Sequence, residues 1–266
     1  MRVLVTGAAG SLGRVLVPGL LDRGHDVVGM DLVVAPEGTP AEWHVADCAD
    51  ADAVEAVFAE AGSGDPVEGV VHLAGIPDET SLDDALASHV LTTGTLLDAI
   101  LRHGTTRLVY ASSNHAVGRT PRTDPVDAST PPRPDTFYGV GKVAAEALLR
   151  LYADRYDLDL IALRIGSFLP APETRRHLAT WLSHDDAVRA VDALLTTPQP
   201  GYAVAYGISA NTRAWWDLDP GRALGYHPED DAERWADSLP ASPDDEAEAA
   251  HVGGPFVSER FHRPAR

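Results

Sequence analysis

The stretch that decides the fold is Thr6-Gly7-Ala8-Ala9-Gly10-Ser11-Leu12-Gly13, which places three glycines at the spacing G-x-x-G-x-x-G. An apolar run at residues 3–5 precedes it and Val15-Leu16 follows it, as expected for a tight turn between a buried strand and a helix. Glycines leave out Cβ atoms where the backbone must turn and approach a ligand closely, and a helix start offers free N–H groups. The stretch therefore predicts a phosphate-binding turn.

An acidic residue strengthens this prediction, because the glycine spacing alone also occurs in loops that bind nothing. Asp31 ends the next predicted strand, where a carboxylate can bond the ribose hydroxyls of a dinucleotide. Leu32-Val33-Val34 follows it, so no arginine stands beside it in the sequence to accept a 2′-phosphate, and we expect NAD rather than NADP. The residues expected at the pyrophosphate are Gly7, Gly10, Ser11, Leu12 and Gly13.

Short apolar strands alternate with longer helical stretches through the first part of the chain. Strands are predicted at residues 2–6, 26–30, 42–46, 67–73, 107–112 and 158–165. This βαβ rhythm is typical of a parallel sheet covered by helices on both faces. We therefore predict an α/β fold with a Rossmann-type, doubly wound parallel sheet.

After Ile165 the pattern loosens into a predicted helix at about 185–195, a predicted strand near 202–208 and proline-rich acidic connections. We expect residues from about 166 to 266 to form a small substrate-binding cap over the C-terminal edge of the sheet, where open α/β sheets bind ligands. Residues 1–266 then make up a single domain, since this length fills one core. Pro18 lies too deep in the first predicted helix for a first-turn proline, and we expect a kink there.

Composition and charge disfavour several classes of protein. Asp and Glu number 40 against 21 Lys and Arg, and the formal net charge of −19 argues against nucleic acid and anionic membranes as partners. The single cysteine, Cys48, excludes an intrachain disulfide and a thiolate metal cluster. No apolar run approaches the length of a membrane span, and a strand at residues 2–6 leaves no room for a signal peptide, so we expect a cytoplasmic protein. A homo-oligomer remains open.

Tyr138 and Lys142 form the pattern Y-x-x-x-K at the start of a predicted helix, where a spacing of four puts both on one face. A tyrosine near its ordinary pKa of ~10 is a poor base at neutral pH, and a neighbouring ammonium favours the phenolate. Ser113 follows the strand predicted at 107–112, and we expect its hydroxyl in the same crevice. Because Y-x-x-x-K occurs often by chance, an ordinary helical pair is the alternative.

Together these motifs resemble the extended short-chain dehydrogenase/reductase superfamily. The positions that carry the resemblance span residues 1–166 and are Gly7, Gly10, Gly13, Asp31, Leu73-Ala74-Gly75, Ser113, Tyr138 and Lys142. Further segments resemble the uronate dehydrogenases of this superfamily, which oxidise D-galacturonate or D-glucuronate at C1 with NAD. These segments are Ala111-Ser112-Ser113-Asn114-His115, Leu163-Arg164-Ile165-Gly166-Ser167, Thr180-Trp181-Leu182-Ser183-His184-Asp185-Asp186, Ser209-Ala210-Asn211 and Trp215-Trp216-Asp217.

The resemblance implies a role for each matched residue. Tyr138 would take the proton of the anomeric hydroxyl while C1 passes a hydride to NAD, which gives the aldarolactone, and Ser113 would bond the same oxygen. Lys142 would hold the nicotinamide ribose and lower the pKa of Tyr138. Arg176 matches the arginine that pairs with the sugar carboxylate, although the adjacent Arg175 leaves the register open. Implied further sugar contacts are Asn114, His115 and Ser167, and implied further cofactor contacts are Asp47, Cys48, Leu73, Ala74, Gly75 and Ile165. For Asp47, a plain turn aspartate is an equal alternative.

Two positions depart from the superfamily pattern. The motif N-V-x-G-T is replaced by His89-Val90-Leu91-Thr92-Thr93, so a histidine stands in place of the asparagine of the extended catalytic set. The proton-relay or structural role of that asparagine is therefore open here. Pro77 stands where a substrate-contacting serine is expected, and proline offers neither a hydroxyl nor a backbone donor.

Two residue groups admit a second interpretation. Ser183-His184-Asp185-Asp186 could be drawn as metal ligands, but a serine followed by acids at a helix start is more simply an N-cap, and we expect no metal. Trp215 and Trp216 either stack on a sugar or pack inside the cap.

The leading hypothesis for function is the NAD-dependent oxidation of a hexuronate, a small-molecule sugar acid. Alternatives within the superfamily are a sugar-nucleotide epimerase or dehydratase and a general aldose 1-dehydrogenase. From another class, a non-catalytic dinucleotide-sensing regulator is the competing hypothesis.

Overall fold

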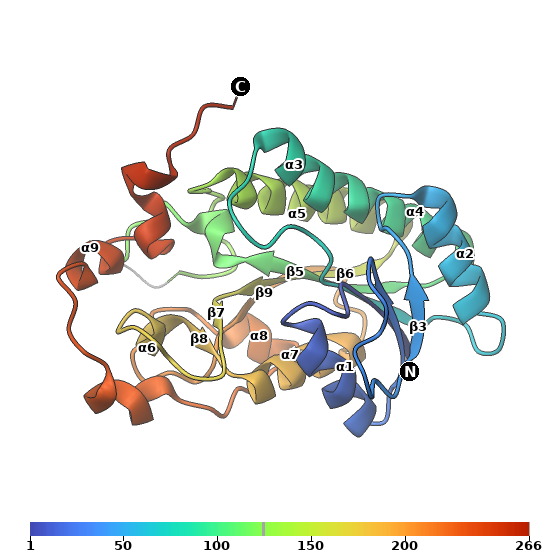
Figure 1. The fold of residues 1–266 in the computed structure, drawn as a ribbon, viewed down its shortest axis with the longest axis horizontal. Coiled ribbons are helices and arrows are strands. Elements are labelled where there is room, and N and C mark those ends of the chain that lie inside the picture. The colour runs from blue at the N-terminus through green and yellow to red at the C-terminus, as the bar shows by residue number, and fades with distance from the viewer. Residues whose placement is uncertain (124–125, 266) are drawn as a thin grey trace.

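A parallel sheet forms the centre of the protein in the computed structural model, which describes residues 1–123 and 126–265 (Figure 1). Its strands are β1 (Arg2–Thr6), β2 (Asp26–Asp31), β3 (Glu42–Val45), β4 (Gly69–His72), β5 (Arg107–Ser113), β6 (Asp159–Ile165) and β9 (Tyr202–Gly207). They lie in the order β3-β2-β1-β4-β5-β6-β9, and every neighbouring pair is parallel. The order reverses between β1 and β4, which confirms the predicted doubly wound, Rossmann-type sheet.

Helices cover both faces of this sheet, as Figure 1 shows. They are α1 (Gly13–Asp22), α2 (Ala51–Ala61), α3 (Leu82–Leu86), α4 (Thr92–His103), α5 (Phe137–Tyr156), α6 (His177–Thr180), α7 (His184–Thr196), α8 (Asp219–Ala223) and α9 (Asp245–Ala249). One core cluster joins α1 and α7 to the sheet, and a second joins α2, α4 and α5 to the opposite face. Within β1, Val3 and Val5 belong to the first cluster and Leu4 to the second, the alternation expected of a strand buried on both faces.

The C-terminal third is organised differently from the prediction. β9 pairs in parallel with β6, and α7 packs against α1, so both belong to the central layers. The prediction that they form part of the cap is wrong, because β6, α7 and β9 make one further βαβ crossover on the same sheet. What lies beyond the sheet is a two-stranded sheet of β7 (Ser167–Phe168) and β8 (Trp181–Leu182), the short helices α6, α8 and α9, and several 3₁₀ turns.

Helix α1 continues through Pro18 as far as Asp22, with Pro18 on its exposed face. The proline therefore does not end the helix, and the carbonyl that it leaves without an N–H partner can be solvated. Among the residues described, no helix is both long and apolar enough to cross a membrane.

A buried ion pair fixes α5 against the sheet. Arg164 on β6 donates from Nε and Nη2 to the two oxygens of Glu146 on α5, at 2.9 and 2.8 Å. Ser112 on β5 donates to the same carboxylate at 2.5 Å. Because α5 begins next to Tyr138, these contacts set the position of the predicted catalytic pair relative to β5 and β6.

Candidate active site

A cleft of about 650 Å³ opens where the strands β1, β2 and β4 end. The predicted cofactor residues that line it are Gly7, Gly10, Ser11, Leu12, Asp31, Asp47, Cys48, Leu73, Ala74 and Gly75. The other residues predicted for the cofactor, Gly13, Tyr138, Lys142 and Ile165, are not among the residues that line this cleft. The cleft lies at the point where the strand order reverses, which is where doubly wound sheets bind dinucleotides.

Two glycines of the turn are required by its geometry. Gly7 has a φ of +68°, and a Cβ there would come within 2.7 Å of the Ala74 nitrogen. A Cβ at Gly13 would lie 2.4 Å from the Ala8 carbonyl oxygen, so this glycine lets α1 pack close to the turn. No side chain caps the start of α1, and the N–H groups of Arg14 and Val15 bond to the Gly10 and Leu12 carbonyls, so among the described residues the N–H groups left for a phosphate are those of Ser11, Leu12 and Gly13. These features fit a dinucleotide.

Asp31 is tied to the glycine turn. Its carboxylate accepts hydrogen bonds from the backbone N–H of Ala9 at 2.9 Å and of Val33 at 3.3 Å. Arg14, which the sequence did not single out, also lines the cleft and donates from Nε to the Ala9 carbonyl at 2.7 Å. A carboxylate and a guanidinium therefore hold the N–H and the carbonyl of one residue, Ala9, where only the carboxylate was expected.

Asp47 and Cys48 follow β3 and line the same cleft. The Asp47 carboxylate accepts from the Ala49 N–H at 2.8 Å, so it closes a turn and lines the cleft at once. Burial raises the pKa of the Cys48 thiol to about 12, which keeps it protonated.

Ser113, Tyr138 and Lys142 come together at the ends of β5 and α5. Thr136 caps α5 by accepting from the Gly139 N–H at 3.0 Å, which places Tyr138 in the first turn. The Lys142 ammonium lies 5.3 Å from the centre of the Tyr138 ring and donates to the Ala111 carbonyl at 2.6 Å. The structure thus brings the three residues together as the sequence predicts.

Burial shifts the pKa values of this pair. Burial raises the pKa of Tyr138 to about 12, while the hydroxyl of Ser113 acts to lower it and the charges of Asp78 and Asp135 act to raise it. Burial lowers the pKa of Lys142 to about 7, against the opposing effect of Glu146. Burial is the largest cause of both shifts, and the lowering of the Tyr138 pKa by Lys142 stays a prediction.

His115 is held by a buried carboxylate. Its Nδ1 lies 2.8 and 3.0 Å from the two oxygens of Asp135, whose side chain has no exposed surface. The imidazole packs edge-on against Tyr138, with 5.8 Å between ring centres. The Asp135 carboxylate fixes one nitrogen of His115 and leaves Nε2 for another partner.

Arg176, just before α6, is the arginine that lies in the site. It donates from Nη2 to the Val252 carbonyl at 2.8 Å and lies 3.5 Å from the Ser167 hydroxyl, and Nε makes no hydrogen bond with the described residues. Burial lowers its pKa to about 10, so it remains charged at neutral pH. Arg175 is half-exposed and lies 3.7 Å from Asp245, so Arg176 is the more enclosed of the two arginines, and its pairing with a sugar carboxylate stays a prediction.

A segment that we call the C-terminal strap, residues 250–256, joins Arg176 to the group around Tyr138. It pairs with the loop at residues 118–122 through the Gly253 N–H to Gly118 carbonyl bond of 2.8 Å and the antiparallel bridge between residues 121 and 251. A Cβ at Gly254 would come within 2.2 Å of Arg176 Nε, and the Phe256 ring lies 4.5 Å from the His115 ring. The strap therefore contacts both ends of the predicted sugar site.

Several contacts of this site were not predicted from the sequence. Besides Asp135 and Phe256, Glu79 accepts from the N–H groups of Phe137 and Tyr138 at 3.1 and 3.0 Å, which ties the loop that carries Pro77 to the start of α5. The sequence offered one signal for the Glu79 contact, which is that a carboxylate near a helix N-terminus is stabilising. The spacing of these residues in the sequence does not predict that they pair.

The structure shows the contacts of the two residue groups that admit a second interpretation. Ser183 accepts from the Asp186 N–H at 2.9 Å and so caps α7, as the N-cap interpretation has it. Within residues 1–123 and 126–265, no group of three or more metal-ligating side chains is found. Trp216 is buried against Tyr206 and donates to the Ala179 carbonyl at 3.1 Å, while Trp215 stacks on Trp216, which favours packing over sugar stacking.

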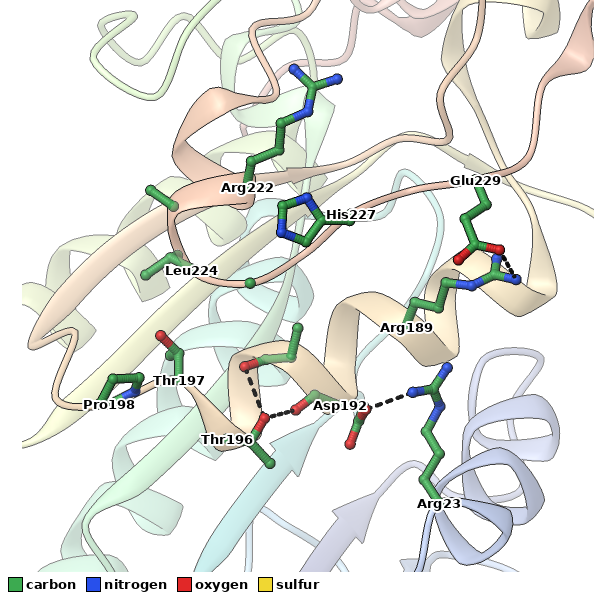
Figure 2. Close-up of a pocket in the computed structure, with 13 residues that line it drawn as sticks. Arg23, Arg189, Asp192, Thr196, Thr197, Pro198, Arg222, Leu224, His227 and Glu229 are labelled. Atoms are coloured by element: carbon green, nitrogen blue, oxygen red, sulfur yellow. Dashed lines mark hydrogen bonds and ion pairs between the residues drawn. The ribbon is translucent and has the colours of Figure 1, made fainter.

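A second cavity of about 580 Å³ lies away from this site, between the end of α1, α7 and the chain after β9 (Figure 2). Arg23 pairs there with Asp192 at 2.7 Å, and Arg189 pairs with Glu229 at 2.9 Å. Because carboxylates compensate these cations, the cavity offers an anion no strong site.

The sequence profile described as the NAD dependent epimerase/dehydratase family matches residues 3–180. Together with the glycine turn and the placement of Tyr138 and Lys142, this match shows that the chain belongs to that family.

Among its relatives, the chain is similar to a uronate dehydrogenase of Pseudomonas syringae pv. tomato, with 36% identity over 97% of this chain and 93% of the relative. Two solved structures are also similar. One is an Agrobacterium tumefaciens uronate dehydrogenase, a tyrosine-to-alanine variant complexed with NAD, at 38% identity, 99% coverage of each chain and a TM-score of 0.89. The other is a glucuronic acid dehydrogenase of Chromohalobacter salexigens at 38% identity, 96% coverage of each chain and a TM-score of 0.86. The resemblance predicted from the sequence is thereby confirmed.

Proposed function

We propose that this protein oxidises a hexuronate at C1 with NAD and releases the aldarolactone. The observation that carries the proposal is Arg176, a partly buried guanidinium whose Nε is buried without a partner among the described residues and which the strap joins to His115 and Tyr138. A buried cation needs a compensating anion, and a planar guanidinium suits a carboxylate.

In the proposed reaction, NAD supplies the hydride acceptor when it is bound in the cleft. Tyr138 takes the proton of the anomeric hydroxyl, and Ser113 donates a hydrogen bond to the same oxygen. Lys142 holds the nicotinamide ribose. Asp135 keeps His115 oriented so that Nε2 can accept from a sugar hydroxyl.

We further propose that residues 1–266 act as one domain in which the chain from about 166 onward supplies the sugar end. Arg176 and Ser167 contribute its polar groups, and Asn114, from the 3₁₀ turn after β5, contributes from the sheet side. A small sugar acid fits this arrangement better than a nucleotide sugar, because the segments beyond the sheet are short.

Formation of NADH with a panel of D-galacturonate, D-glucuronate and their neutral parent sugars tests the proposal. We expect turnover of at least one uronate and NMR detection of a lactone before the aldaric acid. Preference for a neutral sugar would indicate the general aldose dehydrogenase instead. Conversion of a sugar nucleotide without net NADH would indicate the epimerase, and binding of NAD with no turnover of any sugar would indicate the sensor.

A further inference from the structure

The C-terminal strap passes the predicted sugar site as bare backbone. Val252, Gly253 and Gly254 are buried, and Val252 belongs to the same apolar cluster as Trp216. The Val252 carbonyl accepts a hydrogen bond from Nη2 of Arg176 at 2.8 Å. Because the two glycines after Val252 carry no side chain, the strap can lie directly against the polar groups next to it.

Gly253 lies against the carboxylate that holds His115. A Cβ at Gly253 would overlap Oδ2 of Asp135, and so would a Cβ at Gly118, whose carbonyl accepts from the Gly253 N–H at 2.8 Å. The Asp135 carboxylate therefore occupies a space that exists because both positions are glycine. Since Nδ1 of His115 lies 2.8 Å from the same oxygen, a displacement of this carboxylate would move the imidazole as well.

Gly254 lies against the arginine predicted to bind the sugar carboxylate. A Cβ at Gly254 would overlap Nε of Arg176 and lie 2.7 Å from its Cδ. Gly254 also has a φ of +57°, in the left-handed region that favours glycine. A side chain at this position would therefore push Arg176 out of its present place beside the Ser167 hydroxyl.

Adjacent positions of the strap thus contact two different groups of the site. One is the Asp135 carboxylate that orients His115, and the other is the Arg176 guanidinium. Consecutive Cα atoms lie about 3.8 Å apart, so the backbone holds the two contacts at a short, fixed spacing. A misplacement of about 1 Å at a reacting site can cost roughly 10²-fold in rate, so this spacing bears on catalysis.

We propose that Gly253 and Gly254 are positioning residues that divide substrate recognition between them. Gly254 places Arg176 for the sugar carboxylate and thereby sets the preference for an acid over a neutral sugar. Gly253 places Asp135 and His115 beside Tyr138 and thereby sets the rate on either sugar. The inference rests on the proposed oxidation, and it adds the strap backbone to the elements that determine specificity.

The test of Gly254 compares Gly254→Ala with Gly201→Ala. Gly201 has a φ of +59° and, among the described residues, nothing within 4 Å of its Cβ position, so it carries the same backbone strain without the overlap. We expect Gly254→Ala to raise KM for a uronate about tenfold or more and to change kcat/KM for the neutral parent sugar less than about twofold. Gly201→Ala should stay within about twofold of wild type on both sugars. Equal losses in the two variants, or on the two sugars, would overturn the role of Gly254.

A double variant tests whether Gly254 acts through Arg176. In an Arg176→Ala background the overlap is gone, so Gly254→Ala should cause no further loss of acid preference. A further loss as large as the one in the wild-type background would contradict the proposal.

The test of Gly253 compares Gly253→Ala with Gly64→Ala. Gly253 has a φ of −73°, which alanine adopts without strain, and Gly64 has no positive φ and no described atom within 4 Å of its Cβ position. We expect Gly253→Ala to lower kcat about tenfold or more on both sugars with their kcat/KM ratio within about twofold of wild type, and Gly64→Ala to change neither. If Gly253→Ala does not fold, Gly118→Ala presses on the same oxygen and takes its place. A loss of acid preference like that of Gly254→Ala would contradict the division.

A last measurement needs no turnover. In protein labelled with ¹⁵N-histidine and ¹⁵N-arginine, Gly253→Ala should shift the ring nitrogens of His115 and leave Nε of Arg176 in place, and Gly254→Ala should do the reverse. Shifts of both groups in each variant, or of neither, would overturn the inference and leave the proposed function standing. If wild type oxidises no sugar while the two separate shifts appear, the proposed function fails and the placement of these groups by the strap stands.

Discussion

The dinucleotide cleft and the sugar site are built in opposite ways. The cleft is made chiefly of backbone, with Gly7 and Gly13 allowing close approach and the N–H groups of residues 11–13 unbonded among the described residues. The sugar site is made of side chains from distant segments, with Asp135, Arg176 and Phe256 meeting through the C-terminal strap. The first depends on backbone shape, whereas the second depends on compensating buried charges.

This difference predicts where each substitution acts. A change in the sugar site should alter rate and substrate choice while leaving NAD in place. A change in the glycine turn should weaken NAD while leaving the charges around Tyr138 as they are.

The largest expected effect is that of Tyr138→Phe. Loss of the phenol removes the proton acceptor but none of the residues that line the cleft, so kcat should fall by ~10² or more. Calorimetry should find the Kd for NAD within about twofold of wild type. Turnover near that of wild type would remove Tyr138 from the mechanism.

A smaller effect, confined to the cofactor, is expected for Gly7→Ala. A left-handed backbone conformation costs a non-glycine residue about 1–3 kcal/mol, which corresponds to roughly 5- to 150-fold in the Kd for NAD. Gly24→Ala is the matched control, because Gly24 has a φ of +84° but nothing within 4 Å of its Cβ position and does not line the cleft. If both variants weaken NAD alike, the effect is general destabilisation.

Arg14→Ala should change cofactor choice by several-fold. Arg14 is the cation beside Asp31 in the cleft, and its removal leaves the carboxylate alone to repel a 2′-phosphate. The ratio of kcat/KM for NAD over NADP should therefore rise about threefold or more. An unchanged ratio would show that Arg14 has no part in cofactor choice and only donates a hydrogen bond to the Ala9 carbonyl.

The smallest effect concerns stability against pH. Burial lowers the pKa values of His72 and His89 to about 3, below the usual value of 6.5, so the unfolded chain binds more protons in between. The free energy of unfolding should fall as the pH drops from 6.5 toward 3, by on the order of 2 kcal/mol per histidine at pH 5. Urea unfolding at pH 7 and pH 5 measures this, and His72→Gln should reduce the difference. An undiminished pH dependence in that variant would contradict the assignment.

The two regions also differ in how far the sequence predicts them. The glycine turn, Asp31 and the strands are encoded by short stretches whose period and residue types carry the information; the structure confirms the sheet and brings the glycine turn and Asp31 to one cleft. The assignment of β9 to the cap failed because a short apolar strand does not reveal which neighbour it pairs with. The assignment of α7 to the cap failed because its sequence likewise does not reveal which element it packs against.

For the sugar site, the sequence identified the polar residues but not the residues with which they form hydrogen bonds and ring contacts. Asp135 is 20 residues from His115, and Val252 is 76 residues from Arg176, so only the fold brings them together. Nothing in the neighbouring sequence distinguishes Arg175 from Arg176. Their separation depends on which one points inward just before α6.

The measurement that tests the central claim most directly compares Arg176→Ala with Arg175→Ala on a uronate and on its neutral parent sugar. Truncating one partner of a desolvated charge pair costs about 2–5 kcal/mol, so Arg176→Ala should lower kcat/KM for the uronate by roughly 30-fold to several thousand-fold. Arg175→Ala, which removes a half-exposed cation near Asp245, should stay within about twofold of wild type, and activity on the neutral sugar should change little in either variant. Equal loss on acid and neutral sugars in Arg176→Ala would contradict the carboxylate-binding role.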